Sequence, residues 1–209
     1  MALREPKFIY FDLGNVLLYF DHHLAARQMA ATAGISEELA WQTVFDGELE
    51  NHYEAGQVSS QDFHHHFCQV TQSQPDYQAL LHAASNIFEL NIAIVPLVAH
   101  LNRARYRLGI LSNTNEAHWR FINDGRYAIV RDFFPVAALS FEIGVMKPDP
   151  RIYLSAATLA GVAPHDIFYT DDREENVAGA LAAGFDAVQF HDARQLGAEL
   201  RRCNLQSNY

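Results

Sequence analysis

The sequence predicts an α/β protein: a parallel sheet with helices on both faces, into which a bundle of helices is inserted. Three observations support this fold class. Short apolar runs alternate with helical patterns over much of the chain, one long segment is helical without strands, and each apolar run stops at polar residues. Strands that alternate with helices are typical of a doubly wound parallel sheet, because each parallel strand needs a crossover connection.

Four apolar runs rich in aromatic and β-branched residues predict buried strands. The runs cover residues 8–11, 108–111, 167–170 and 187–190. The polar residues that follow them are Asp12, Ser112-Asn113, Asp171-Asp172 and His191-Asp192. Since the carboxyl ends of parallel strands meet at one edge of a sheet, we expect these side chains to share that edge.

Helical patterns precede or separate the later runs, over residues 92–105, 150–160 and 174–183. Pro150 directly follows Asp149 and suits the first turn of a helix, where a missing N–H costs nothing. Gly184 is expected to cap the end of the third helix. We expect these helices to cover the faces of the sheet.

The segment from residue 21 to residue 88 has apolar residues at helical spacing and predicts four short amphipathic helices. Ser59-x-x-Asp62 resembles a capping box, and Pro75 is expected to open the last helix. Because the segment follows the first strand, it would stand over the carboxyl ends of the strands, where open sheets bind ligands. We therefore expect a core of residues 1–17 and 92–209 and a helical cap of residues 18–91.

Composition narrows the class of protein. The chain has 209 residues, a formal net charge of −10 and two cysteines, Cys68 and Cys203. An acidic chain repels phosphate backbones, so we expect no nucleic-acid partner, and the absence of an apolar run of about 18 residues predicts no membrane span. The low cysteine content and the lack of a secretion signal favour a cytoplasmic location.

A cation is expected among the polar residues at the strand ends. Asp12, Asp171 and Asp172 would repel one another if they lie close together, so a positive charge must compensate them. Oxygen ligands without a nearby thiol or paired histidine indicate Mg²⁺ rather than zinc. The three consecutive histidines at 64–66 are not expected to bind a metal, because consecutive helical residues point about 100° apart.

Four short motifs resemble, in order, those of the haloacid dehalogenase-like (HAD) hydrolase superfamily. They are Asp12-Leu-Gly-Asn-Val16, Ser112-Asn113, Lys147-Pro148 and Asp171-Asp172. The match covers nearly the whole chain and implies a Rossmann-like doubly wound core with an inserted α-helical bundle cap. The start Asp-Leu-Gly-Asn-Val, followed later by Leu-Ser-Asn-Thr-Asn, is also similar to the branch that contains α-glucose-1-phosphate phosphatases.

The resemblance implies a Mg²⁺-dependent phosphatase acting on a small phosphorylated metabolite. Asp12 would be the nucleophile, and it would form an aspartyl-phosphate intermediate without needing a base, because a carboxylate is already ionised at pH 7. The ammonium of Lys147 would bind phosphate and relieve the repulsion between nucleophile and substrate. Ser112 and the backbone N–H of Asn113 would donate hydrogen bonds to the phosphate oxygens.

The same resemblance implies a set of metal ligands. Mg²⁺ would be held by Asp12, by the backbone carbonyl of Gly14 and by Asp172. Asp172 is preferred to Asp171 because Asp172-x-x-x-Asn176 matches the spacing of the family, with Asn176 behind the ligands. Asp171 is the alternative ligand.

The sequence departs from the family pattern at Gly14, where most phosphatases of the superfamily carry a second aspartate that protonates the leaving oxygen. General acid catalysis contributes about 10²–10⁴-fold, so its loss slows the reaction without abolishing it. The departure favours leaving groups that depart unprotonated, such as the anomeric oxygen of a sugar 1-phosphate. His22, His23 and Asp21 are candidate replacements for the missing acid.

Two other functions compete with a phosphatase. One is a dehalogenase, since such enzymes of the superfamily also lack the second aspartate, although they need no metal and their fourth motif differs. The other is a non-catalytic protein that binds phosphate or a partner. The intact Asp12, Lys147 and Asp172 argue against it, because a binding protein has no need of an ionised carboxylate beside phosphate.

Overall fold

The computed structural model describes residues 5–203 and Leu205. Its centre is a five-stranded sheet in the order β5-β4-β1-β6-β7, and each neighbouring pair is parallel. The strands are β1 (Phe8–Phe11), β4 (Leu108–Ser112), β5 (Val136–Leu139), β6 (Ile167–Asp171) and β7 (Asp186–Gln189). All residues of β1, β4 and β6 are buried, as expected of strands covered on both faces.

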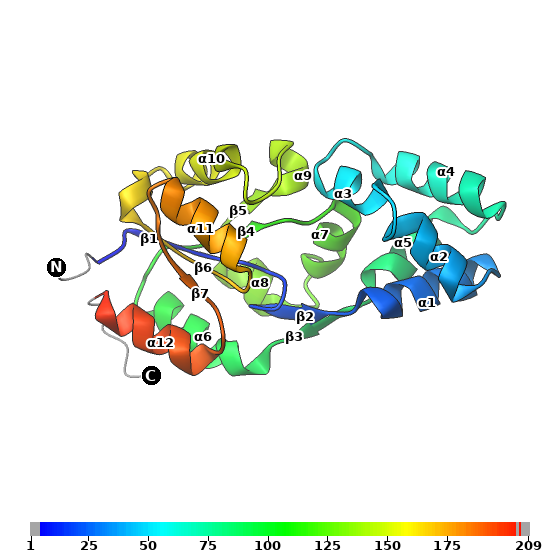
Figure 1. Cartoon of the computed structure of the whole chain (residues 1–209). Coiled ribbons are helices and arrows are strands. Elements are labelled where there is room, and N and C mark those ends of the chain that lie inside the picture. The colour runs from blue at the N-terminus through cyan, green and yellow to red at the C-terminus, as the bar shows by residue number, and fades with distance from the viewer. Residues whose placement is uncertain (1–4, 204, 206–209) are drawn as a thin grey trace.

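Helices cover both faces of the sheet (Figure 1). One face is covered by α10 (Pro150–Ala160) and α11 (Glu174–Ala182), and the other face is covered by α6 (Val95–Arg103) and α12 (Ala193–Arg202). Residues of β1 alternate between them: Phe8 and Tyr10 belong to the apolar cluster under α10, whereas Ile9 and Phe11 belong to the cluster under α6. Burial of these side chains, at about 25 cal/mol per Å² of apolar surface, fixes the central strand between two cores.

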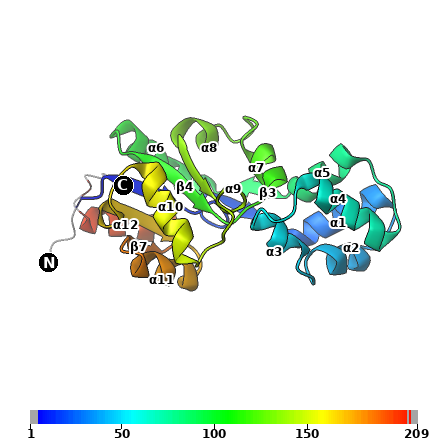
Figure 2. The same ribbon diagram turned by 90° about the horizontal axis from the view of Figure 1, so that it is seen from above.

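A helical region with its own apolar core is inserted after β1, and it lies beyond one end of the sheet (Figure 2). Its helices are α1 (His22–Ala33), α2 (Glu37–Val44), α3 (Leu49–Glu54), α4 (Ser60–Thr71) and α5 (Tyr77–Ser85). The chain enters through β2 (Leu18–Phe20) and returns through β3 (Phe88–Leu90), which pair as antiparallel strands. The two crossings therefore run side by side.

The structure confirms the α/β fold class with a helical insertion after the first strand. The four predicted strands are present within one residue, and α10 has the predicted bounds. Ser59 and Asp62 form the expected capping box. The remaining helices are α7 (Glu116–Ile122), α8 (Ala128–Phe133) and α9 (Ser140–Ile143), with two 3₁₀ turns, η1 (Ile92–Ile94) and η2 (Pro164–Asp166).

Several sequence predictions were wrong in detail. The inserted region has five helices rather than four. Helix α3 has only six residues, and its two buried side chains, Leu49 and Tyr53, are too few to reveal a helical period. Its last helix begins at Tyr77 with Asp76 as N-cap, so Pro75 precedes it. The helix expected to start at residue 92 begins as the 3₁₀ turn η1. By contrast, Gly184 caps the end of α11 as predicted: its φ is +92°, and the N–H groups of Gly184 and Phe185 donate to the carbonyls of Leu181 and Ala180.

No helix in the described part of the chain has the length and apolar character needed to cross a membrane.

Candidate active site

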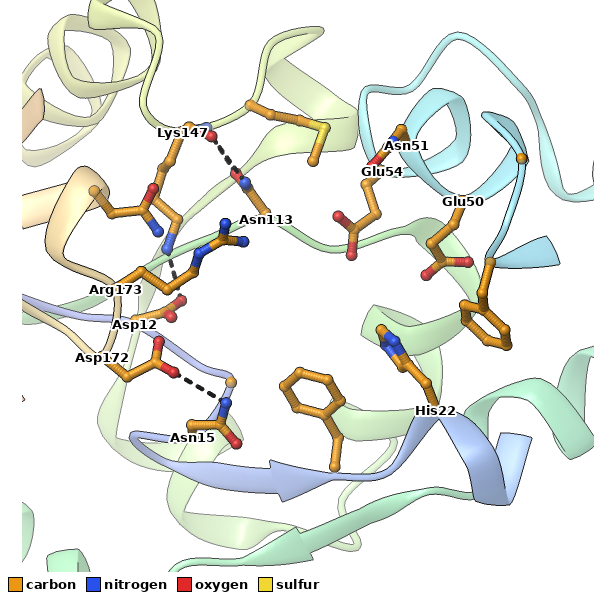
Figure 3. A pocket seen from close by; sticks show the side chains of 16 residues that line it. Asp12, Asn15, His22, Glu50, Asn51, Glu54, Asn113, Lys147, Asp172 and Arg173 are labelled. Atoms are coloured by element: carbon orange, nitrogen blue, oxygen red, sulfur yellow. Dashed lines mark hydrogen bonds and ion pairs between the residues drawn. The ribbon is translucent and has the colours of Figure 1, made fainter. Parts of the chain in front are cut away.

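The ends of three neighbouring strands bring the sequence motifs together. The sheet order places β1 between β4 and β6, so Asp12 follows the central strand while Ser112 ends β4 and Asp171 ends β6. Lys147 reaches the same edge from the loop between α9 and α10. Figure 3 shows Asp12, Lys147 and Asp172 around one pocket. The structure thus gathers residues that lie far apart in the sequence, as their positions at strand ends predict.

The ammonium group of Lys147 is buried between two carboxylates. Its Nζ lies 2.8 Å from Oδ1 of Asp12 and 2.6 Å from Oδ2 of Asp171. It also lies 3.2 Å from the carbonyl oxygen of Leu111 and 2.9 Å from the hydroxyl of Tyr169. The side chain of Lys147 is 1% exposed, so one positive charge balances two negative charges where water does not screen them.

Burial and the neighbouring charges move the pKa values of the three groups differently. Burial would lower the pKa of Lys147, but the carboxylates of Asp12 and Asp171 hold it above its ordinary value. Burial would raise the pKa of Asp171, but Lys147 holds it below the ordinary value. Burial raises the pKa of Asp12 to about 7, and the charge of Asp171 adds to the rise. Lys147 opposes this rise in the pKa of Asp12 but does not cancel it, because the same ammonium group also pairs with Asp171.

Asp171 and Asp172 have different surroundings. Asp171 is fully buried and does not line the pocket; it accepts hydrogen bonds from the hydroxyl of Tyr169 and from Nδ2 of Asn176, the latter at 3.0 and 3.1 Å. Asp172 is half-buried, lines the pocket and accepts a hydrogen bond of 3.0 Å from Nδ2 of Asn15. Asn176 thus supports the lysine-bound carboxylate rather than Asp172.

The acidic cluster fits a divalent cation. Carboxylate oxygens of Asp12, Asp171 and Asp172 lie within 4.8 Å of one another. Only Asp12 and Asp172 of these three line the pocket, beside Gly14, whose carbonyl is the third expected ligand. Mg²⁺ prefers hard oxygen ligands such as carboxylates. The three carboxylates also carry more negative charge than the single ammonium group of Lys147 neutralises.

Ser112 and Asn113 lie beside this cluster. Ser112 is buried, and its hydroxyl donates to the carbonyl of Asn113 at 3.1 Å. The side chain of Asn113 holds the Lys147 loop: Nδ2 donates to the carbonyl of Lys147 at 3.1 Å, and Oδ1 accepts from its N–H at 2.8 Å. This side chain therefore positions Lys147, a role that the sequence analysis did not foresee.

Packing explains why residue 14 has no side chain. A Cβ placed on Gly14 would lie 2.8 Å from Cε1 of Phe20, well inside van der Waals contact. The Phe20 ring in turn contacts the rings of His22 and Phe88. The ring of Phe20 thus occupies the space that the second aspartate of the family pattern would need.

The inserted region forms the opposite wall of the pocket, which has a volume of about 300 Å³. Helix α3 contributes Glu50, Asn51 and Glu54 to this wall (Figure 3). Burial raises the pKa of Glu50 to about 8 and that of Glu54 to about 7. Sequence analysis missed both; the spacing i, i+4, which puts two acidic side chains on one helical face, was the available signal.

Three residues proposed as replacement acids are arranged differently from one another. Asp21 is the N-cap of α1 and accepts hydrogen bonds from two backbone N–H groups of its first turn. His23 is exposed and stacks on Trp41, with a centroid distance of 4.2 Å. Only His22 lines the pocket, where it stacks on Phe45 and burial lowers its pKa. Asp21 and His23 are therefore not placed to protonate a substrate.

The histidines at 64–66 lie at the surface of α4, as expected. His65 and His66 are exposed, and His64 is half-buried with Nε2 2.9 Å from the carbonyl oxygen of Pro75. The group of side chains in the described residues that could hold a metal ion lies elsewhere, at Asp12, Asp171 and Asp172.

Comparison with known proteins places the fold and the motifs in context. A family model described as haloacid dehalogenase-like hydrolase matches residues 6–184. Over 111 residues the chain is 31% identical to glyceraldehyde 3-phosphate phosphatase of Methanopyrus kandleri, an alignment that covers 52% of this chain and 46% of that protein. The chain spans about half the length of the curated relatives that it matches.

Solved structures share the whole fold. The HAD family enzyme BT-2542 of Bacteroides thetaiotaomicron, in complex with magnesium and inorganic phosphate, has a TM-score of 0.76 and 23% identity, with 91% of this chain and 95% of that chain covered. A HAD-like family hydrolase of Porphyromonas gingivalis has a TM-score of 0.77 and 25% identity, with 99% and 100% covered.

Proposed function

The chain belongs to the haloacid dehalogenase-like hydrolase family, and from that premise we propose that it is a Mg²⁺-dependent phosphatase of small phosphomonoesters. The observation that carries the proposal is the grouping of Asp12 and Asp172 within 4.8 Å, beside the buried ammonium of Lys147. A nucleophilic carboxylate, a fixed positive charge and an acidic cation site are the parts that phosphoryl transfer to an aspartate requires.

The residues of the site support two chemical steps. A carboxylate oxygen of Asp12 attacks phosphorus, the bond from phosphorus to the ester oxygen breaks, and an aspartyl phosphate forms. Water then attacks the phosphorus of this intermediate, which releases phosphate and restores the carboxylate. Lys147 stabilises the negative charge at the phosphoryl oxygens, and Ser112 and the N–H of Asn113 donate hydrogen bonds to them.

Asp12, Asp172 and the carbonyl of Gly14 would hold the Mg²⁺. When bound, the ion offsets the repulsion between the carboxylates and a phosphate dianion. Asp171 is already paired with Lys147 and accepts a hydrogen bond from Asn176, so it would hold the lysine in place rather than bind the ion.

The substrate class that fits the pocket best is a small sugar phosphate, with sugar 1-phosphates as the first candidates. The cap wall of Glu50, Asn51 and Glu54 offers polar groups that suit the hydroxyls of a sugar, and about 300 Å³ suits a small molecule. The Methanopyrus kandleri relative acts, by its name, on a small sugar phosphate. We assign selectivity to the cap, residues 18–91, and the nucleophile, the cation site and the phosphate-binding groups to the core, residues 1–17 and 92–209.

A phosphatase assay tests the proposal. The purified protein should release phosphate from p-nitrophenyl phosphate with Mg²⁺ and lose this activity with excess chelator. Asp12→Asn should abolish turnover, whereas Asp132→Asn, an exposed aspartate that pairs with Arg131, should leave it unchanged.

Two outcomes would replace the proposal. Activity that survives chelation, or that is seen only with 2-haloacids, would favour a dehalogenase. Phosphate binding without turnover of any phosphoester would favour a non-catalytic protein. If the enzyme is a phosphatase, sugar 1-phosphates should give a higher kcat/KM than the corresponding 6-phosphates.

A further inference from the structure

The proposed phosphatase lacks an acid where its family usually has one. An ester oxygen that leaves without a proton departs as an alkoxide, which is a poor leaving group. Gly14 supplies no proton, and the ring of Phe20 fills the space beside it. The inference that follows rests on the proposed function and concerns which group of this chain protonates the leaving oxygen.

Most titratable groups of the pocket wall have another role. Lys147 is bonded to two carboxylates, and Asp172 belongs to the cation site. His22 is stacked on Phe45, and burial lowers its pKa, which disfavours the protonated ring that a proton donor needs. The remaining acids that line the pocket are Glu50 and Glu54 of α3.

Glu54 is the one placed against the phosphate side of the pocket. It lines the main pocket together with Asp12 and Lys147. It also lines an adjoining cavity of about 40 Å³ together with Ser112 and Asn113, and it is the only carboxylate among the described residues that lines both. In Figure 3 its carboxylate points from the cap into the space in front of Asn113, whereas Glu50 lies farther toward His22.

Contacts on both sides of Glu54 fasten α3 to the core. The preceding residue, Tyr53, accepts a hydrogen bond of 3.2 Å from the N–H of Ala117 in α7, and its hydroxyl lies 2.7 Å from Oγ of Ser60. Ser60 in turn donates to Glu116 of α7 at 2.5 Å. Two residues after Glu54, a Cβ on Gly56 would overlap the carbonyl of Phe141 in α9. The position of Glu54 over the site is therefore set by the core.

We infer that Glu54 is the general acid of the first step and the general base of the second. As Asp12 attacks phosphorus, the breaking P–O bond leaves its electron pair on the ester oxygen, which takes the carboxyl proton of Glu54 and departs as an alcohol. The Glu54 carboxylate then accepts a proton from the water that attacks the aspartyl phosphate. Phosphate leaves, Asp12 is restored as a carboxylate, and Glu54 is protonated again.

The electrostatic setting agrees with this role. Burial raises the pKa of Glu54 to about 7, while Lys147 and Arg173 pull it down, and Glu50 stands one turn away on the same helix. A group with a pKa near the working pH can both give and take a proton.

Glu54→Gln, an isosteric change that removes the proton, tests the inference. We compare kcat/KM for two aryl phosphates with Mg²⁺ present: p-nitrophenyl phosphate, whose phenolate leaves readily, and phenyl phosphate, whose leaving group is far more basic. The variant should lose about 10²–10⁴-fold with phenyl phosphate and less than about tenfold with p-nitrophenyl phosphate. A burst of p-nitrophenol should show that the aspartyl phosphate accumulates. Glu48→Gln, on an exposed side chain next to α3, is the matched control and should match the unaltered protein.

The outcomes separate this inference from the proposed function. If the unaltered protein hydrolyses neither ester with Mg²⁺, the phosphatase proposal fails. If it hydrolyses both and Glu54→Gln loses the same factor with each, or changes only KM, then Glu54 is not the acid. If the unaltered protein already discriminates steeply against phenyl phosphate, no residue protonates the leaving oxygen and the inference is also overturned.

Discussion

Asp171 and Asp172 are neighbours in the sequence, but their carboxylates face different partners. Asp171 is buried against Nζ of Lys147 at 2.6 Å, whereas Asp172 lines the pocket and is bonded by Asn15. Two successive residues at the end of β6 therefore differ in role: Asp171 is a buried partner of Lys147, and Asp172 is the proposed metal ligand. This division predicts two distinct mutant phenotypes.

Asp172→Asn should weaken Mg²⁺ binding by at least about tenfold, and excess Mg²⁺ should restore part of the activity. Asp171→Asn should destabilise the fold by about 3–5 kcal/mol, because it removes one partner of a buried ion pair, and Mg²⁺ should not restore it. Mg²⁺ titrations of activity and urea unfolding measure the two effects. Equal losses of Mg²⁺ affinity in both variants would contradict the division.

Mg²⁺ affinity should rise with pH up to about pH 7 and level off above it. The pKa of Asp12 is raised to about 7 by burial in the metal-free protein, and a carboxyl must lose its proton to bind a cation. Below that pH, affinity should change by up to about tenfold per pH unit. Calorimetric titration at several pH values checks this, and a flat profile from pH 5 to 8 would show that Asp12 is ionised throughout.

The metal-free protein should lose stability as the pH rises from about 5 to about 8. Burial raises the pKa values of Asp12, Glu50 and Glu54 to about 7, 8 and 7. The folded state then binds more protons than the unfolded state in this window, so raising the pH favours unfolding. Glu50→Gln should raise Tm at pH 8 and flatten the trend, and Glu48→Gln should do neither. A Tm that increases from pH 5 to 8 would refute the assignment.

Gly14→Asp should destabilise the protein by about 1–3 kcal/mol, because the new Cβ meets the ring of Phe20. Combining it with Phe20→Leu should recover part of the loss, since the smaller side chain vacates the contact. Thermal unfolding of the two single variants and the double variant gives the coupling energy. Strict additivity would mean that the ring does not exclude a side chain at residue 14.

Gly56→Ala should destabilise the protein more than Gly34→Ala. Both glycines have a left-handed backbone, with φ of +69° and +68°, so both variants lose about 1–2 kcal/mol. Only at Gly56 does the added methyl group overlap the core, at the carbonyl of Phe141. A methyl group on Gly34 would point into open space, with no atom other than those of its chain neighbours within 4 Å of the methyl carbon. Urea unfolding and hydrogen exchange in α3 should show the extra loss and a loosened cap. Equal effects would mean that the contact is easily relieved.

Much of the fold follows from local patterns. The strands β1, β4 and β6 are buried on both faces, so each is a continuous apolar run that the sequence marks clearly. Polar residues at the end of each run mark the edge of the sheet where the candidate site lies. The strand β5 was missed because its residues, Val-Ala-Ala-Leu, include two alanines and no aromatic residue, so their composition is not typical of a strand. The pairing of β2 with β3 joins residues about seventy positions apart, which no local pattern reveals.

The core half of the candidate site could be predicted, and the cap half could not. Asp12, Lys147 and Asp172 lie in short motifs at strand ends, whose meeting point follows from parallel topology. Glu50 and Glu54 lie on a helix held in place by tertiary contacts such as that of Tyr53 with Ala117. The sequence near α3 puts Glu50 and Glu54 on one helical face, but it does not tell which part of the core that face meets.

The antiparallel pairing of β2 with β3 also bears on how such a protein can change over time. Phe20 and Phe88 are register partners, so the stretch between them leaves and rejoins the core at one place. Insertions or deletions in that stretch leave the strand order and the strand-end residues Asp12 and Asp172 in place, provided that α3 with Glu54 is kept. The inserted region can thus vary in length and sequence outside α3 while the edge of the sheet beneath it keeps its arrangement.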